Sequence, residues 1–242
     1  MKFFSANFQQ NLNNLERFTT TNLMKINTKK TYVMIFNNSR SYDFPPELSF
    51  SDGSHLQVVE ETKLLGVMLQ SNLKWNSNTQ FIVKKAMMRM WLLRRLKSLK
   101  LEPQFIIEYY VKEIRPIVEH AVPVWHSSIT KQQSYSIERI QKVALKIILG
   151  DLYGSYSSAC QQFSLEKLSD RRDRLCKNFS TKLFLSNRRR EFFSPPNNTR
   201  NTRNAKLHLV KENNTRTKLA FNAPHNYLAR LVNINKDSTH SK

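Results

Sequence analysis

The chain has 242 residues and a formal net charge of +21, with 39 lysines and arginines against 18 acidic residues. Apolar residues make up 40% of it, which is enough to bury a core, and its two cysteines are too few for a disulfide framework. This composition argues against an ordinary metabolic enzyme and favours a polyanionic partner, bound through counterion release.

The start of the chain, MKFFSANFQQ, lacks the apolar core of a signal peptide, and no apolar run approaches the ~20 residues of a membrane span. Cys160 and Cys176 lie too far apart for a CxxC metal site. We therefore expect an intracellular protein, nuclear or cytoplasmic, without membrane contact. The charge is uneven, because residues 77–242 hold 31 of the basic residues and only 12 of the acidic ones.

The first third of the sequence predicts one helix followed by short strands. Apolar residues at three- and four-residue spacing predict an amphipathic helix over 7–23, and a turn follows at Asn27 and Thr28. The segment 37–47 contains two prolines and is expected to be a loop. Asp52 and Gly53 are typical of a hairpin turn. Strands are expected over 31–36, 47–50, 55–59 and 63–69.

After Trp75 the spacing of apolar residues changes to a helical period. Helices are expected over 78–99, 103–115, 131–149 and 165–185, and Gly150 is a suitable C-terminal cap for the third. We predict an α+β fold in three parts. A small antiparallel sheet with a flanking helix (1–74) precedes a basic helical region (75–190), and a basic, partly flexible tail (191–242) ends the chain.

Three of the predicted helices carry cations for a partner. Arg139, Lys142 and Lys146 align on one side of the helix over 131–149, where they either contact phosphate groups or form a solvated face. An arginine on an apolar stripe, such as Arg172, is typically paired with a buried carboxylate. The remaining candidates for nucleic-acid contact belong to the helices over 78–99 and 165–185: Lys84, Lys85, Arg89, Arg94, Arg95, Arg171 and Arg174.

No set of residues in the sequence forms a convincing catalytic centre. The six aspartates are scattered, and the adjacent Glu60 and Glu61 would point to opposite faces of a strand. Two-metal phosphoryl transfer needs carboxylates that share ions roughly 3.5–4 Å apart. With only four glycines, the chain also has no glycine-rich phosphate loop. We expect no metal site, no cofactor and no small-molecule ligand in this chain.

The order of several motifs, taken together, resembles the C-terminal half of a reverse transcriptase of non-long-terminal-repeat retrotransposons of the jockey type. Residues 7–36 resemble the helix, turn and strand that follow the catalytic Asp-Asp strand pair, with an Asn-x-x-Lys-Thr signature spelled here from Asn27 to Thr31. TKLLGVMLQSNLKW (62–75) is similar to the hairpin that grips the primer end, and residues 82–99 resemble the first thumb helix. ERIQKVALKIILG and SLEKLSDRRDRLCKNF resemble later segments of the same reading frame.

The resemblance implies a fragment of an RNA-directed DNA polymerase that retains rear palm and thumb. Lys30, or Lys29 in its place, would lie near the phosphates of the incoming nucleotide; alternatively Lys30 only keeps a strand edge soluble. Leu65 and Gly66 would contact the primer, or Gly66 marks a β-bulge or a tight packing point. The aspartates that bind magnesium belong to segments expected upstream, so magnesium is expected only for the full-length polymerase.

The sequence is therefore consistent with three interpretations of function. The chain is a reverse-transcriptase fragment that holds RNA or an RNA–DNA hybrid but is inactive alone, or it is a stand-alone basic module that binds such nucleic acids without chemistry. The third is an interaction protein whose helices pack on another chain. Loss of nucleic-acid binding after replacement of Arg139, Lys142 and Lys146 would count against this third interpretation.

Overall fold

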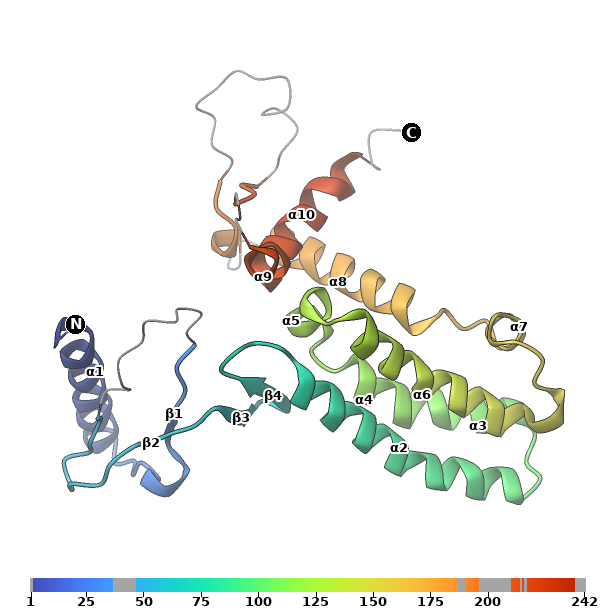
Figure 1. The fold of residues 1–242 in the computed structure, drawn as a ribbon, viewed down its shortest axis with the longest axis horizontal. Helices are drawn as coiled ribbons and strands as arrows, with labels where there is room; N and C mark the ends of the chain where they lie inside the picture. Colours follow the sequence, from blue (N-terminus) through green and yellow to red (C-terminus); the bar gives the residue numbers. More distant parts are fainter. Residues whose placement is uncertain are drawn as a thin grey trace. The chain divides into compact units, whose positions relative to one another are not determined.

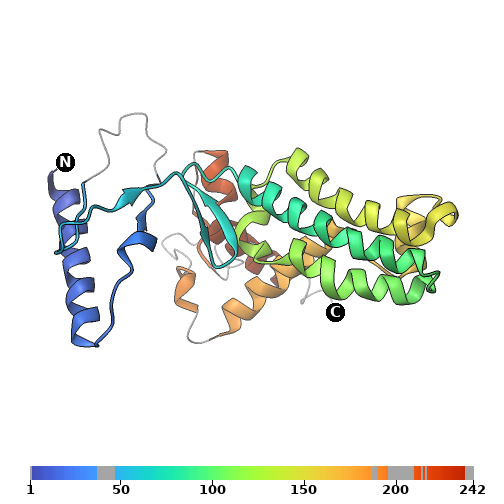
Figure 2. The same ribbon diagram turned by 90° about the horizontal axis from the view of Figure 1, so that it is seen from below.

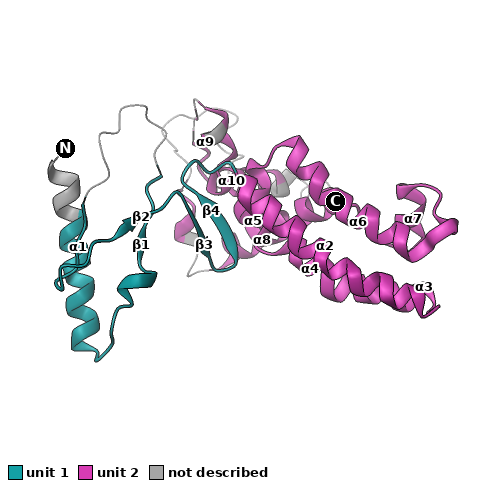
Figure 3. Cartoon of the chain, turned by 60° about the horizontal axis from the view of Figure 1, so that its bottom comes forward, with its two compact units in different colours: residues 1–74 teal, residues 75–242 magenta. Residues whose placement is uncertain are grey.

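The fold comes from a computed structural model, which describes residues 2–36, 47–186, 190–195, 210–213, 215 and 217–237 (Figure 1). The chain divides into two compact units, 1–74 and 75–242 (Figure 3). The division falls where the spacing of apolar residues changes. The fold is α+β, as predicted, with small two-stranded ladders in the first unit and helices throughout the second.

The first unit is built around one helix and a hairpin that packs on it. In α1 (Lys2–Thr21), Leu12 is buried against Leu48 and Phe50. Polar contacts fix the same pair of segments, because the Gln9 amide both donates to the Ser49 carbonyl (2.8 Å) and accepts from the Ser49 N–H (3.1 Å). The helix and the segment 48–56 therefore share a small core.

The strands of this unit are shorter than the sequence predicts. The predicted strands 31–36 and 55–59 contain only β1 (Tyr32–Val33) and β2 (Gln57–Val58), which pair in parallel. The turn at Asp52 and Gly53 is confirmed: Ser49 and His55 face each other in an antiparallel bridge, and the Asp52 carboxylate accepts from the Ser54 N–H (2.8 Å). The predicted loop 37–47 lies mostly outside the described residues.

The predicted single strand over 63–69 is wrong, because the chain reverses inside it. β3 (Glu61–Leu64) pairs antiparallel with β4 (Val67–Gln70), and Leu65 and Gly66 form the two-residue turn between them. Both turn residues have positive φ, +48° and +88°, as a twisted two-residue hairpin requires. The apolar run concealed the turn, whereas the resemblance did imply a hairpin there.

The second unit contains three long helical segments that lie side by side (Figures 1 and 2). α2 (Asn76–Ser98) packs on α6 (Lys131–Leu149) and on the segment formed by α3 (Pro103–Tyr109), the π-helical turn η2 (Tyr110–Ile114) and α4 (Arg115–Glu119). The buried side chains include Met90, Leu93, Ile106, Tyr110, Ile114, Ile137 and Ile148.

The second predicted helix extends four residues further than expected. The predicted end at residue 115 directly precedes Pro116, and a proline inside a helix lacks an N–H and clashes with the preceding turn. Instead the π-helical turn widens the helix just before that proline, and the Arg115 N–H donates to the Tyr110 carbonyl five residues back. The wider turn accommodates Pro116, and the helix continues to Glu119.

Shorter elements connect these helices to the end of the chain. α5 (Val122–Trp125) and η3 (His126–Ser128) lead into α6, and η4 (Gly150–Leu152) follows it. The predicted helix over 165–185 begins only at α8 (Leu168–Leu185). A separate helix, α7 (Tyr156–Gln162), precedes it and was not predicted, although Ser155 and Ser158 cap its first turn reciprocally.

The described part of the predicted tail belongs to the second unit. After η5 (Arg190–Phe192), the chain forms α9 (Lys218–Asn222) and α10 (Pro224–Asp237), and α10 packs on α8 and α5. Leu228, Leu231 and Val232 are buried. Their helical spacing indicates a packed helix, which the prediction of a partly flexible tail did not take into account. Within the described ranges, no helix combines the length and apolarity that a membrane crossing requires.

Candidate nucleic-acid interface

The helix α6 presents its charged side to solvent because its other side is committed to the core. Ile137, Ile140 and Ala144 are buried and follow the helical period. The start of the helix is fixed by a capping box, in which Thr130 and Gln133 bond reciprocally (3.2 and 2.6 Å). Its orientation in the unit is therefore set by packing and capping, and not by its cations.

The three cations predicted on this helix share one hollow of about 400 Å³, which we call the α6 hollow. Arg139, Lys142 and Lys146 project into it from successive turns, and the chain that follows α6 closes the other side. The remaining lining residues are Tyr135, Val143, Tyr153, Gly154, Ser155 and Tyr156. Basic residues interleaved with aromatic rings are the usual composition of a surface that binds single-stranded nucleic acid.

Tyrosine rings hold the two lysines of the α6 hollow. The Lys142 ammonium lies 5.1 Å from the centre of the Tyr135 ring and 5.2 Å from that of Tyr156, and the Lys146 ammonium lies 5.4 Å from that of Tyr153. These are cation–π distances, so each lysine is attracted to a ring face. Within the part of the chain that the structure describes, no carboxylate forms an ion pair with Arg139, Lys142 or Lys146.

Tyr156 is held in place by a buried hydrogen-bond network. Its hydroxyl donates to the Glu138 carboxylate and accepts from the Gln141 amide nitrogen (3.0 Å), while the Gln141 carbonyl accepts from the buried Tyr110 hydroxyl (2.8 Å). Burial first, and then the bond to Glu138, raises the pKa of Tyr156 far above its usual value, so the phenol stays neutral. The ring is therefore positioned before any ligand arrives.

The acidic residue of α6 that lies nearest to the cations in sequence, Glu138, is paired with another residue and not with them. The Glu138 carboxylate accepts the N–H groups of Leu168 and Ser169 at the start of α8 (2.9 Å each) and pairs with Arg172 (3.8 Å). The expected pairing of Arg172 with a carboxylate is confirmed; the Arg172 side chain is 1% exposed, and that of Glu138 is 13% exposed. The α6 hollow thus keeps its positive charge because the neighbouring acid is used elsewhere.

The arginines predicted on α8 are not part of this site. Arg171 bonds to the Glu119 carboxylate through Nε and through Nη2 (3.0 Å), and Arg174 makes a forked contact with Glu166 (2.9 and 2.7 Å). A phosphate group would have to displace these carboxylates. The sequence did not reveal these pairs because the partners come from other helices or loops.

The cations of α2 form a second, separate surface. Lys84, Lys85, Arg94 and Arg95 are exposed, and Arg89 pairs with Glu113 (3.8 Å). None of them lines the α6 hollow, although α2 packs on α6. Trp91, which is 67% exposed, lies between Lys84 and Arg95 at helical spacing and was not predicted as a site residue.

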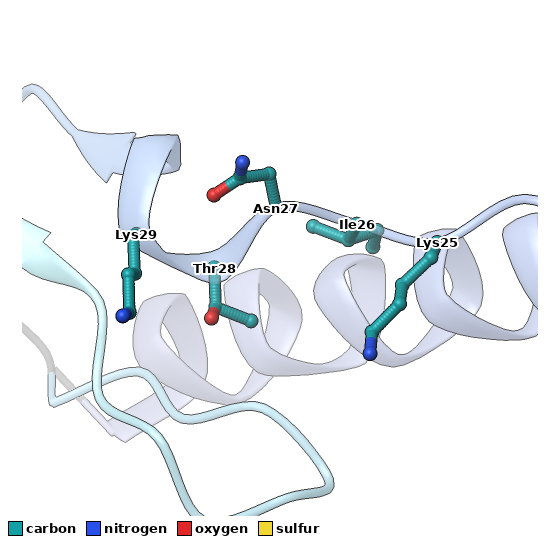
Figure 4. Close-up of a pocket in the computed structure, with 5 residues that line it drawn as sticks. All are labelled: Lys25, Ile26, Asn27, Thr28 and Lys29. Carbon is teal, nitrogen blue, oxygen red and sulfur yellow. The ribbon is translucent and has the colours of Figure 1, made fainter.

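The candidates of the first unit lie beside a hollow and at the tip of a hairpin. A hollow of about 330 Å³ is lined by Lys25, Ile26, Asn27, Thr28 and Lys29 (Figure 4). Lys30 is exposed and does not line it, whereas Lys25 and Lys29 do. Leu65 is 88% exposed at the hairpin tip, and the positive φ of Gly66 is explained by the turn itself.

The sequence named the cations of the α6 hollow but missed its tyrosines. Tyr135 lies one helical turn before Arg139 on the same face, which is a visible signal. Tyr153 and Tyr156 lie beyond the end of the helix, where no periodicity predicts which way a side chain points. Among the described residues, no group of three histidine, cysteine or acidic side chains is placed to hold a metal ion.

Comparisons with protein-family models, curated proteins and solved structures yield no match for this chain. The class that the geometry itself defines is a helical unit with a cationic hollow walled by tyrosines. The assignment of a function therefore depends on the chemistry of that hollow.

Proposed function

We propose that the chain binds RNA or an RNA–DNA hybrid, and that the α6 hollow is its main contact with the phosphate backbone. The observation that carries this proposal is the convergence of Arg139, Lys142 and Lys146 with three tyrosines. Among the described residues, no carboxylate forms an ion pair with these three cations. Cations supply salt-dependent attraction to phosphate, and tyrosine faces supply stacking that tolerates any base.

The exposed cations of α2 extend this interface. Lys84, Arg95 and Trp91 combine charge with an aromatic face on a helix that is itself anchored by buried Met90 and Leu93. We assign them a supporting role, because none of them lines the α6 hollow. Arg171 and Arg174 are left out of the proposed interface, since carboxylates already occupy them.

We further propose that the chain is the rear-palm and thumb part of a retrotransposon reverse transcriptase, with no polymerase activity of its own. The support is the ordered motif resemblance, together with a hairpin at Leu65 and Gly66 where the resemblance implies one. Aspartates of the described residues serve local roles, as Asp52 does in its turn and Asp173 does beside His126. Purified chain with magnesium, template and primer should incorporate no nucleotide; robust incorporation would overturn this part of the proposal.

The binding proposal is tested by the salt dependence of affinity for a single-stranded RNA. Each lost phosphate contact lowers the slope of log K against log salt by about 0.7 on a single strand, so Arg139→Gln, Lys142→Gln and Lys146→Gln together should lower it by about 2. The matched control replaces three exposed lysines outside the hollow: Lys177→Gln, Lys182→Gln and Lys218→Gln. Equal slopes for the two triple variants would refute the proposed site.

The same experiment distinguishes nucleic-acid binding from the alternative that the chain is an interaction protein. That alternative is favoured by α1, on which Phe8, Leu15 and Phe18 are exposed although they are apolar. If the helices serve only to pack on another protein, RNA retention should be unchanged in the α6 triple variant. A flat salt dependence of the unaltered chain would count against nucleic-acid binding altogether.

A further inference from the structure

The α6 hollow carries more positive charge than one backbone phosphate can use. This inference rests on the proposed binding of nucleic acid. A phosphodiester within a strand carries one negative charge, whereas a phosphate monoester carries about 1.5 to 2 at pH 7. Arg139, Lys142 and Lys146 converge within three turns of one helix, and no described carboxylate pairs with them. Charge matching therefore favours a monoester.

The shape of the hollow favours a strand end over a continuous strand. Its volume of about 400 Å³ falls in the range of small-ligand sites, roughly 300–1,000 Å³. It is bounded by α6 on one side and by Tyr153, Gly154, Ser155 and Tyr156 on the other. A volume of this size can hold one terminal nucleotide.

The tyrosines supply both fixed and adaptable contacts. Tyr156 is anchored through Glu138 and Gln141, so its ring face and the Lys142 ammonium above it form a rigid wall. Tyr135 is 56% exposed, so a base has access to its ring. The hollow thus offers cations to a phosphate group and an exposed tyrosine ring to the base attached to it.

We propose that the α6 hollow is a terminal-phosphate site, which binds the phosphorylated end of a nucleic-acid strand with the end base against Tyr135. The two lysines are held by their ring contacts and provide point charges, and Arg139 provides the planar fork that suits a phosphate with free oxygens. Binding at this site is noncovalent and changes no bond.

The test uses the full-length chain and three single-stranded RNA oligonucleotides that are identical except for their ends. One carries a 5′-phosphate, one a 3′-phosphate, and one neither, and each is titrated by fluorescence anisotropy at one ionic strength. We expect at least one phosphorylated form to bind about tenfold more tightly than the unphosphorylated form, because an added charge faces several cations at close range. The preference should shrink from about pH 7.5 to about pH 5.5, as the monoester takes up its second proton near pH 6.

Variants assign the preference to the hollow. Arg139→Gln with Lys142→Gln should abolish it, while Lys177→Gln with Lys182→Gln should keep it. Far-ultraviolet circular dichroism of each variant establishes that it is folded. Equal affinity for all three oligonucleotides, with binding still dependent on Arg139 and Lys142, would overturn the terminal-phosphate site and leave the proposed function intact. No measurable binding of any oligonucleotide would overturn both.

Discussion

The buried ion pair between Arg172 and Glu138 gives the sharpest prediction of stability. Arg172 is 1% exposed; its Nη2 donates to the Ser134 hydroxyl (2.7 Å) and its Nε to His126 Nδ1 (3.4 Å). Burial lowers the pKa of its guanidinium, which shows that the surroundings penalise the charge. Replacing Arg172 with methionine removes the cation and leaves the Glu138 carboxylate in the core.

Removing one partner of a buried ion pair lowers the free energy of unfolding by about 3–5 kcal/mol. Glu138 keeps three hydrogen-bond donors, from Leu168, Ser169 and Tyr156, so the loss should lie at the lower end, about 3 kcal/mol. With a urea m-value of about 2–3 kcal/mol/M, the unfolding midpoint should fall by about 1–1.5 M. All three tryptophans lie in residues 75–242, and buried Trp125 contacts His126, so their fluorescence reports unfolding of this unit.

Arg174→Gln is the matched control on the same helix. Its partner Glu166 is also an acid, but the pair is about half exposed, so the loss should not exceed about 1 kcal/mol. If Arg172→Met lowers the midpoint no more than Arg174→Gln does, then Glu138 is not a buried charge in need of a partner, and the reasoning fails.

Two further predictions concern other parts of the fold. Burial lowers the pKa of His126, although the bond between its Nε2 and Asp173 (2.8 Å) opposes this shift. The folded state therefore binds the proton less readily than the unfolded state, and the free energy of unfolding should fall as the pH drops below about 6.5. Urea midpoints measured across pH should show a smaller fall in His126→Gln. Gly66→Ala should cost about 1 kcal/mol or more because φ is +88° there, and faster amide exchange in β3 and β4 would reveal it.

Each of these predictions has its own control. For His126, an unchanged pH profile in the glutamine variant would mean that other titrating groups set the acid sensitivity. For Gly66, the comparison is Gly154→Ala, where φ lies outside the left-handed region and the nearest atom to an added methyl, Ser158 Oγ, lies 3.7 Å away. Equal exchange rates in the two alanine variants would contradict a strained turn.

Periodicity in the sequence was sufficient to predict the long helices and their buried faces. The apolar spacing of Ile137, Ile140 and Ala144 fixed the orientation of α6, and with it the side on which Arg139, Lys142 and Lys146 lie. The same reasoning failed where local chemistry overrides the pattern. Leu65 and Gly66 reverse a run that reads as one strand, and a π-helical turn carries a helix past Pro116.

The site was only partly predictable because its charge balance depends on long-range contacts. Arg171 and Arg139 are indistinguishable as surface cations in the sequence, yet one is paired with Glu119 and the other is not. Likewise, Tyr156 joins the α6 hollow because its hydroxyl reaches Glu138, a contact between residues 18 positions apart. No helical period encodes such partners.

Photo-crosslinking of the full-length chain to a single-stranded RNA containing 4-thiouridine tests the central claim most directly. If the α6 hollow contacts the strand, peptides carrying Tyr135, Tyr153 or Tyr156 should be the main crosslinked species, and the Arg139, Lys142 and Lys146 glutamine variant should lose them. Crosslinks confined to α8 or to residues 1–74, with these tyrosine peptides unmodified, would contradict the account.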